Sequence, residues 1–219
     1  MTEKSVLFKL PEEHIYAPVT RYDDPLRYYY KPVIGRLYVK RIQDGLSMLT
    51  PPCDRVLDFG YGSGLLFNTL AEIGKELHGI DILSDAVTLA EILDRQHIRA
   101  MLKQEDILKA GYPDNYFDLI TAFSVFEHIR DCDPILKEMH RIMKPGGQLL
   151  IGMPSVNRVM PWLFKAIGFN NIDDHHITNH RSVLKSAKQY FTLKNYKRLP
   201  SFLPDRCCLY FNMLLEKQS

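Results

Sequence analysis

The stretch Asp58-Phe59-Gly60-Tyr61-Gly62-Ser63-Gly64 decides the fold of this chain of 219 residues. It follows a short apolar segment, 55–59, that predicts a buried strand, and it precedes a helical pattern over 65–75. Because glycine has no Cβ, alternating glycines let the backbone take a positive φ and approach a ligand closely. The stretch therefore predicts a ligand-binding turn at the edge where open α/β sheets bind ligands.

Strand and helix patterns alternate on both sides of this turn. Further strands are predicted over 77–81, 99–104, 117–123 and 148–153, and helices over 32–49, 84–97 and 133–143. Ser84 is the expected N-cap of the helix over 84–97. Such an alternation predicts a parallel sheet with helices on both faces.

The end of the chain has a different pattern. A helical stretch over 181–190 is followed by strands over 191–199 and 207–215, and the short link between these strands requires antiparallel pairing. The sequence thus predicts an α/β fold, a Rossmann-like doubly wound sheet of seven mostly parallel strands with an antiparallel C-terminal pair. We expect residues 1–50 to form a helical extension or lid and residues 51–219 to form the main domain.

Composition narrows the class of protein. The chain is 46% hydrophobic with a formal net charge of +2, which allows a sizeable core and disfavours nucleic acid as the main partner. Its four cysteines lack the C-x-x-C spacing, as expected of free thiols in a reducing cytosol. We find no signal-peptide pattern and no apolar segment of about 20 residues, so a soluble, cytoplasmic protein is expected.

Acidic residues follow three of the predicted strands. They are Asp58, Asp81 and Asp106. A carboxylate at Asp81 can accept both hydrogen bonds of a ribose diol, and three acidic residues suit a cationic sulfonium ligand better than a pyrophosphate. Leu65 stands where the dinucleotide fingerprint has its last glycine, which disfavours a nicotinamide-dependent oxidoreductase. A helix-capping role for Asp106 remains an alternative.

Four segments, in order, resemble the class I S-adenosylmethionine (SAM) dependent methyltransferases. They are Val56 to Gly64, Gly79 to Ile82, Tyr116 to Ile129 and Leu136 to Gly147. The similarity covers about residues 54–155 and is nearest to the small-molecule branch that includes ubiquinone-biosynthesis methyltransferases. It implies the class I methyltransferase fold, SAM as the methyl donor and S-adenosylhomocysteine (SAH) as the product.

The same resemblance implies which residues hold the donor. The methionine portion would lie against Asp58, Gly60, Gly62 and Gly64, the ribose and adenine against Asp81, Ile82, Asp106 and Ile107, and Phe123 and Ser124 would face the cofactor. The family more often has smaller residues at Phe59 and Tyr61. The aromatic stretch 28–30 fits either a lid over the donor or anchors that pack a helix on the sheet.

The acceptor side is less determined by the sequence. Because imidazole titrates near neutral pH, His128, His175 and His176 are candidate general bases for an O-methylation, and a structural role for His128 is equally open. Some relatives hold a divalent ion with a Glu-x-x-Glu-His arrangement. Here Ser124 replaces the first glutamate and leaves Glu127 and His128, so no metal is expected.

An apolar segment follows the strand over 148–153. Residues 156–169 fit an acceptor pocket, a peripheral membrane contact or plain core packing. The sequence therefore predicts methylation, on oxygen or nitrogen, of a small-molecule, sugar or lipid-linked acceptor. The alternatives are a non-catalytic SAM-binding protein of the same fold and an RNA or protein methyltransferase.

Overall fold

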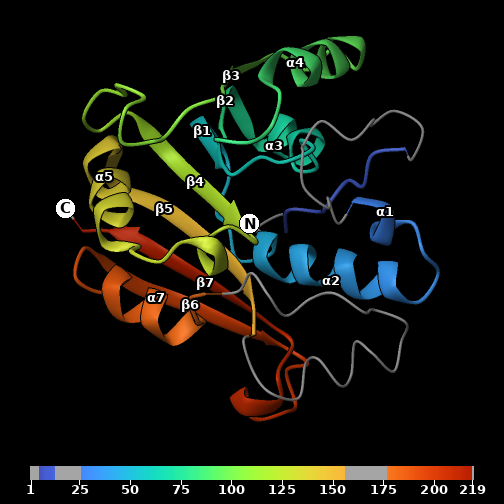
Figure 1. The fold of residues 1–219 in the computed structure, drawn as a ribbon, viewed down its shortest axis with the longest axis vertical. Coiled ribbons are helices and arrows are strands. Elements are labelled where there is room, and N and C mark those ends of the chain that lie inside the picture. Colours follow the sequence, from blue (N-terminus) through green and yellow to red (C-terminus); the bar gives the residue numbers. More distant parts are fainter. Residues whose placement is uncertain (1–4, 13–25, 156–176, 219) are drawn as a thin grey trace.

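The computed structural model of the chain describes residues 5–12, 26–155 and 177–218. Its centre is a seven-stranded sheet in the order β3-β2-β1-β4-β5-β7-β6 (Figure 1). The strands are β1 (Cys53–Phe59), β2 (Gly74–Ile80), β3 (Ala100–Lys103), β4 (Phe117–Phe123), β5 (Met143–Pro154), β6 (Phe191–Leu199) and β7 (Tyr210–Lys217). Strands β1 to β5 pair in parallel, and β7 pairs antiparallel with β5 and β6. The predicted fold class is confirmed.

Helices cover both faces of the sheet. They are α1 (Leu26–Tyr29), α2 (Ile34–Leu46), α3 (Phe67–Ile73), α4 (Ala86–Arg95), α5 (Asp133–Ile142) and α7 (His180–Ala187), with the short 3-10 helices η1 (Phe126–His128) and η2 (Asp205–Cys207). None of the helices in the described residues is long and apolar enough to cross a bilayer.

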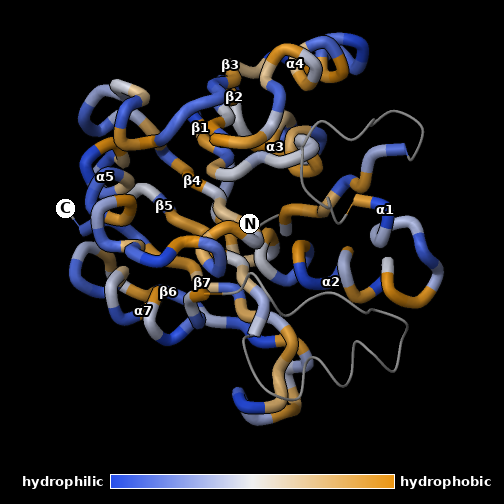
Figure 2. Tube along the Cα trace, in the orientation of Figure 1, coloured by the Kyte–Doolittle hydropathy of each residue, from blue (hydrophilic) through white to orange (hydrophobic). Residues whose placement is uncertain are grey.

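Neighbouring residues of each strand enter two different cores. Val56 packs in the core under α2, α3 and α4, whereas Leu57 packs in the core under α5 and α7. The same split separates Leu119 from Ile120 in β4, because successive side chains of a strand point to opposite faces. Apolar residues therefore line both faces of the central strands. Figure 2 shows hydrophobic stretches along β4 and β5. This continuous burial explains why these strands lack a polar alternation.

Several bounds of the sequence-based assignment are wrong. The helix predicted over 65–75 ends at Ile73, the strand predicted from 77 begins at Gly74, and the strand predicted over 207–215 is Tyr210–Lys217. The N-cap of α4 is Asp85, whose side chain accepts hydrogen bonds from the amides of Val87 and Thr88 at 2.9 and 3.1 Å. Ser84 is buried instead, because its amide is held by Asp81. Strand β5 begins at Met143 and not at 148, because the pairing with β4 already starts there. The cap is set by local hydrogen bonds one residue later than expected, whereas the start of β5 is set by pairing with β4, which a local pattern does not contain.

Polar contacts join helix α2 to the N-terminal segment on one side and to the sheet on the other. Gln43 holds the N-terminal segment through the amide of Phe8 at 2.7 Å and the carbonyl of Val6 at 2.8 Å. On the sheet side, Asn212 of β7 donates through Nδ2 to the carbonyl oxygen of Arg41 at 3.0 Å. The helix consequently lies beside the carboxyl end of β4 (Figure 1) and brings its side chains to the edge of the sheet where the predicted ligand turn lies.

Candidate functional site

The glycine turn after β1 has the predicted geometry. Gly60, Gly62 and Gly64 have φ angles of 72°, 52° and 81°, which is the left-handed region that side chains disfavour. A Cβ on Gly64 would lie 2.6 Å from Leu89 of α4, and one on Gly60 would collide with Val125. The turn thus depends on glycine both for its backbone conformation and for the space around it.

Asp81 joins the ends of β1 and β2. Its Oδ2 accepts a hydrogen bond from the amide of Gly62 at 3.0 Å, and its Oδ1 accepts from the amides of Leu83 and Ser84 at 2.7 and 3.0 Å. The next residue, Ile82, is 65% exposed although it is apolar. The arrangement places a fixed carboxylate and an open apolar surface beside the glycine turn.

Asp58 is a buried carboxylate at the end of β1. It is 3% exposed, and its Oδ1 accepts a hydrogen bond from the hydroxyl of Thr121 at 2.7 Å. Burial raises the pKa of Asp58 to about 7, the Thr121 hydrogen bond opposes this, and the charge of Asp81 adds to it. A cation bound nearby would favour the charged form of this group.

The residues predicted to contact adenine lie after β3. Asp106 is half-buried, and its Oδ1 accepts from the amide of Leu108 at 3.0 Å, within its own turn. Ile107 is 2% exposed and packs in the core under α5. The Asp106 side chain is therefore held within its own turn, and Ile107 is part of the core under α5.

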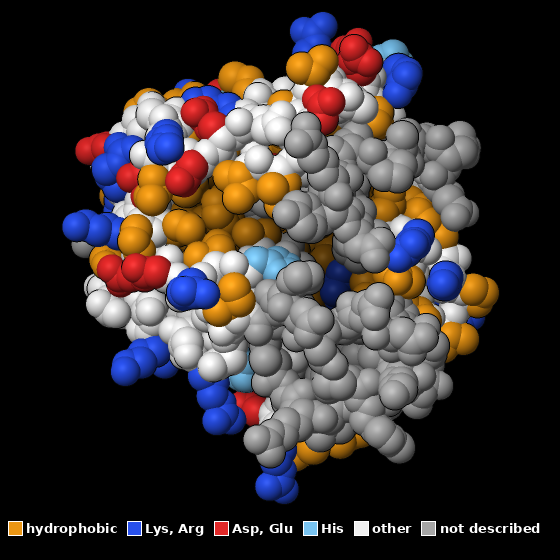
Figure 3. Space-filling view, in the orientation of Figure 1, with side chains coloured by type: hydrophobic (Ala, Val, Ile, Leu, Met, Phe, Trp, Pro, Cys, Tyr) orange, Lys and Arg blue, Asp and Glu red, His pale blue; other side chains and the backbone are white. Residues whose placement is uncertain are grey.

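Ser124 occupies a strained position directly after β4. Its φ is 57°, its amide donates to the carbonyl oxygen of Gly152 at 2.7 Å, and its hydroxyl lies 3.2 Å from the hydroxyl of Tyr210. A positive φ in a residue with a side chain is held only where the surroundings enforce it, and such positions cluster at functional sites. Phe123 is half-buried beside it, with its ring close to Gly45 of α2. Figure 3 shows that apolar side chains gather over β4 on this face.

Glu127, on η1, is a second buried carboxyl group. It is 1% exposed, and among the described residues its Oε2 has no hydrogen-bond partner. Burial raises the pKa of Glu127 to about 8, against an opposing effect of the nearby Arg41 charge. At neutral pH the group is therefore mostly protonated, and a protonated carboxyl group can donate a hydrogen bond.

The histidines predicted as bases are only partly placed by the structure. His128 is exposed on η1, next to Glu127. His175 and His176 lie outside the described residues, as does the apolar segment 156–169. His180, a further histidine of this region, is buried against Phe211 with its ring centroid 3.6 Å away, and burial lowers its pKa to about 4. In the described ranges no group of three or more His, Cys, Asp or Glu side chains could hold a metal ion.

Sequence reasoning missed Arg41 and Tyr210, which the fold brings to the Ser124 hydroxyl and the Glu127 carboxyl group. Tyr210 begins β7 and is 2% exposed, and the Arg41 guanidinium lies 5.0 Å from the centroid of its ring. One signal was available for Arg41. It lies three residues after Tyr38, on the stripe of α2 that is otherwise apolar and buried. No comparable signal marked Tyr210, because only the antiparallel pairing of β7 with β5 carries it to this place.

Comparison with known proteins identifies the domain. A family model described as a methyltransferase domain matches residues 57–151. The chain is 29% identical over 123 residues to a ubiquinone biosynthesis O-methyltransferase of Pseudomonas aeruginosa, which covers 52% of this chain and 50% of that protein. It is 31% identical over 105 residues to phosphoethanolamine N-methyltransferase 2 of Caenorhabditis elegans, covering 47% and 24%. The chain spans about half the length of the ubiquinone biosynthesis relatives it matches.

Solved structures share the fold over most of the chain. The PH0226 protein of Pyrococcus horikoshii superimposes with a TM-score of 0.70 at 18% identity, covering 89% of this chain and 96% of that one. The N-methyltransferase NodS of Bradyrhizobium japonicum, in complex with SAH, gives a TM-score of 0.64 at 18% identity, covering 91% and 94%. The chain therefore carries a match to a methyltransferase domain over residues 57–151, and it has the class I methyltransferase fold.

Proposed function

We propose that the chain catalyses methyl transfer from SAM to a small-molecule acceptor, with the donor bound at the carboxyl ends of β1, β2 and β4. The observation that carries the proposal is the glycine turn with positive φ at Gly60, Gly62 and Gly64, closed by the carboxylate of Asp81. This combination fits SAM, because the turn lets the backbone approach the ligand and the carboxylate can accept from its ribose.

Each predicted donor residue has a proposed role that agrees with its place. Asp58 faces the positive charge of the methionine portion, and its pKa of about 7 is that of a group which a cation would readily ionise. Asp81 holds the ribose, and the exposed Ile82 covers one face of the adenine. Asp106 and Ile107 border the adenine, while Phe123 and Ser124 face the reacting end of the donor.

SAM supplies a methyl group that its positive sulfur already activates, so the protein mainly has to orient the acceptor and exclude water. The buried side of the site, from Ser124 to Tyr210, is suited to this because its hydroxyls are fixed against each other at 3.2 Å. An acceptor hydroxyl must also lose a proton, and His128, His175 and His176 remain the proposed bases.

The matched relatives suggest which acceptors should be tested first. A ubiquinone biosynthesis O-methyltransferase is among them, which supports O-methylation of a small or lipid-linked aromatic compound. A phosphoethanolamine N-methyltransferase is also among them, which supports N-methylation of a small amine as the second candidate. The proposed contact of 156–169 with a membrane or a lipid-linked acceptor falls outside the described residues.

The test is SAH formation, followed by mass spectrometry, with SAM and a panel of catechols, phenols, phosphoethanolamine and RNA. We expect turnover with a catechol or phenol and a loss of at least tenfold in kcat for His128→Ala, with His97→Ala as the matched histidine control. Tight SAH binding with no turnover on any acceptor would favour a non-catalytic SAM-binding protein. Methylation of RNA with strongly salt-dependent binding would replace the small-molecule proposal.

A further inference from the structure

Arg41 carries a positive charge into the interior between α2 and β7. Its side chain is half-buried, and its guanidinium lies 4.0 Å from the ring centroid of Tyr38, 5.0 Å from that of Tyr210 and 5.6 Å from that of Tyr29. Guanidinium remains protonated in proteins. Aromatic faces stabilise a cation only in part, so a charge placed here calls for an anionic partner.

The described residues do not supply that anion. Nη2 of Arg41 donates to the hydroxyl of Tyr29 at 3.0 Å, whereas Nε is closed to solvent and has no partner among them. Glu127 is the carboxyl group whose charge interacts with Arg41, but among the described residues its Oε2 has no hydrogen-bond partner and no ion pair joins it to the guanidinium. Acceptor oxygens for the unpartnered Nε of Arg41 therefore have to come from elsewhere.

A small cavity opens at this place. It has a volume of about 30 Å³ and is lined by Tyr38, Arg41 and Tyr210 together with the apolar residues Leu37, Pro154, Leu199 and Leu209. A single water needs about 10–15 Å³, so the cavity takes a group of a few atoms and not a whole acceptor. Its walls are apolar and aromatic apart from the guanidinium.

Tyr210 lines the cavity and also contacts the end of β4, where the methyl-transfer site is proposed. The Tyr210 hydroxyl lies 3.2 Å from the hydroxyl of Ser124, at the end of β4 where the donor is proposed to bind. A molecule anchored at Arg41 would therefore extend towards the donor. Burial raises the pKa of Tyr210 above its usual value, so its hydroxyl stays neutral and adds another donor.

We propose that Arg41 forms a carboxylate-binding subsite, and that the acceptor is an aromatic or apolar carboxylic acid whose carboxylate sits in this cavity. The planar fork of the guanidinium matches a carboxylate, and the tyrosine rings and aliphatic walls suit the apolar body next to it. Naming the ligand as the acceptor rests on the proposed methyl transfer. The anion site itself does not.

The experiment compares benzoate with its neutral isostere benzamide, titrated by saturation-transfer NMR into the full chain with and without saturating SAH. We expect the wild type to bind benzoate at least tenfold more tightly than benzamide. Equal affinity for the two probes would overturn the subsite and leave a cavity that holds water.

Variants of Arg41 test whether the preference for benzoate arises at this residue. Arg41→Gln should remove the preference for benzoate, whereas Arg36→Gln, an exposed arginine on the same helix, should keep it. Arg41→Lys keeps the charge and is the second variant should Arg41→Gln fail to fold. We expect it to weaken benzoate binding several-fold, because an ammonium lacks the fork. A preference that survives both changes at Arg41 would place the benzoate elsewhere and refute the proposal.

Titration with SAH alone separates the two proposals. Failure of SAH to bind would contradict the donor site, while an Arg41-dependent preference for benzoate would still establish the anion site. Conversely, tight SAH binding with no preference for benzoate would contradict only the subsite.

Discussion

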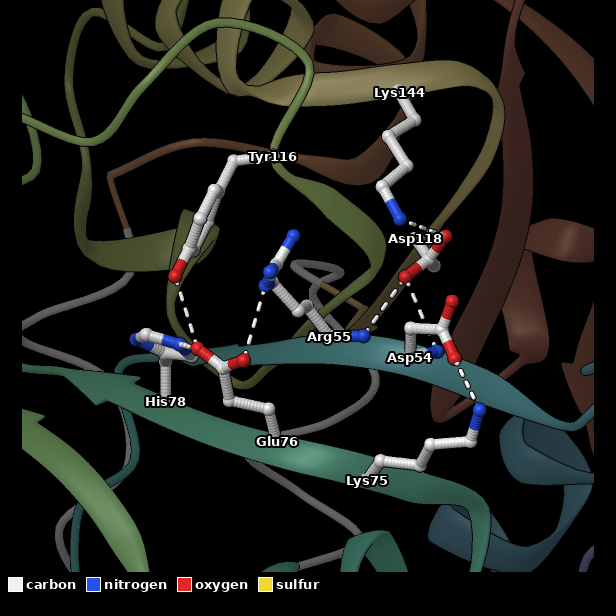
Figure 4. A network of polar contacts seen from close by, with 8 residues as sticks. All are labelled: Asp54, Arg55, Lys75, Glu76, His78, Tyr116, Asp118 and Lys144. Carbon is white, nitrogen blue, oxygen red and sulfur yellow. Dashed lines mark hydrogen bonds and ion pairs between the residues drawn. The ribbon is translucent and has the colours of Figure 1, made fainter.

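Carboxylates near the amino ends of the parallel strands accept hydrogen bonds from several side chains and amides, whereas Asp58 and Glu127, beyond or at the carboxyl ends, are buried with few partners. Glu76, near the start of β2, accepts from Nε2 of His78 at 2.9 Å, the hydroxyl of Tyr116 at 2.9 Å and Nε of Arg55 at 3.0 Å (Figure 4). Asp118 of β4 accepts from the amide of Arg55 at 2.8 Å in the same network. These contacts, led by the His78 hydrogen bond, lower the pKa of Glu76 to about 2.

The carboxyl ends show the opposite shift. Burial raises the pKa of Asp58 to about 7 and that of Glu127 to about 8, and Oε2 of Glu127 has no partner among the described residues. Hydrogen bonds to a charged carboxylate stabilise it, while removal from water without such bonds destabilises it. The amino ends of the strands therefore contribute stability, and the carboxyl ends keep groups that a ligand can satisfy.

The largest effect should come from replacing Glu127 by a side chain that cannot ionise. The folded-state pKa of about 8 lies above the unfolded value, so the native chain holds a proton that the unfolded chain has lost between about pH 4 and pH 8. Stability therefore falls as the pH rises through this window. Glu127→Gln should raise the free energy of unfolding at pH 8 by on the order of 2–4 kcal/mol, and by almost nothing at pH 4.

Urea denaturation of both proteins at pH 5 and pH 8 measures this difference. Glu76→Gln is the matched control at the other end of the sheet. Its folded-state pKa is lowered, so its contribution is present above the unfolded value and the variant should lose stability at pH 8. Parallel pH profiles for the wild type and Glu127→Gln would show that Glu127 is not a buried neutral acid.

A smaller effect is expected in the pH dependence of donor binding. Because the ammonium group of the SAH amino-acid portion would favour the charged form of Asp58, SAH affinity should rise with pH by up to about tenfold per unit below pH 7 and level off above it. Asp58→Asn should bind more weakly and lose this slope. Calorimetry at pH 6 in two buffers of different ionisation enthalpy would detect the released proton.

Asp106→Asn is the control for Asp58, because Asp106 lies at the same edge of the sheet but is only half-buried. It should keep the slope. An Asp58→Asn protein that retained the wild-type slope would assign the titration to another group.

The smallest effect is expected at the amino ends. Glu76→Ala should lower the free energy of unfolding by about 1–2 kcal/mol at pH 7, since solvent weakens contacts of a side chain that is 34% exposed. SAH affinity should not change. Glu91→Ala, an exposed acid of α4, should stay within about 0.5 kcal/mol of the wild type. A clear loss of SAH affinity in Glu76→Ala would break the division between the two ends of the sheet.

The parts of the fold that the sequence predicted are those with strong local patterns. Strand β4 was predicted with the bounds Phe117–Phe123, because its apolar residues are nearly continuous, and β6 with the bounds Phe191–Leu199. The predicted cap of α4 and the predicted start of β5 are wrong, because Asp85 accepts the capping hydrogen bonds and Met143 pairs with Phe117. The first contact is local but lies one residue after Ser84, and the second joins strands that are distant in sequence.

The residues of the candidate site also differ in how well the sequence predicts them. The glycine turn could be predicted, since Gly60, Gly62 and Gly64 follow one another in a single loop. Tyr210 could not, and Arg41 was marked only as a charged residue on the apolar stripe of α2, because the two come from distant parts of the chain and meet only when β7 inserts beside β5. Donor sites in this fold lie on consecutive strand ends, whereas acceptor sites are assembled from distant segments.

The central claim is that the carboxyl ends of the strands bind SAM through Asp81 and the glycine turn. Titration calorimetry with SAH and with NAD, on the wild type and on Asp81→Ala, tests it most directly. We predict micromolar SAH binding that weakens at least about a hundredfold in the variant, because a carboxylate that holds both the ribose and the loop amides is lost, and no binding of NAD. Binding of NAD, or SAH affinity that is unchanged in Asp81→Ala, would contradict the claim.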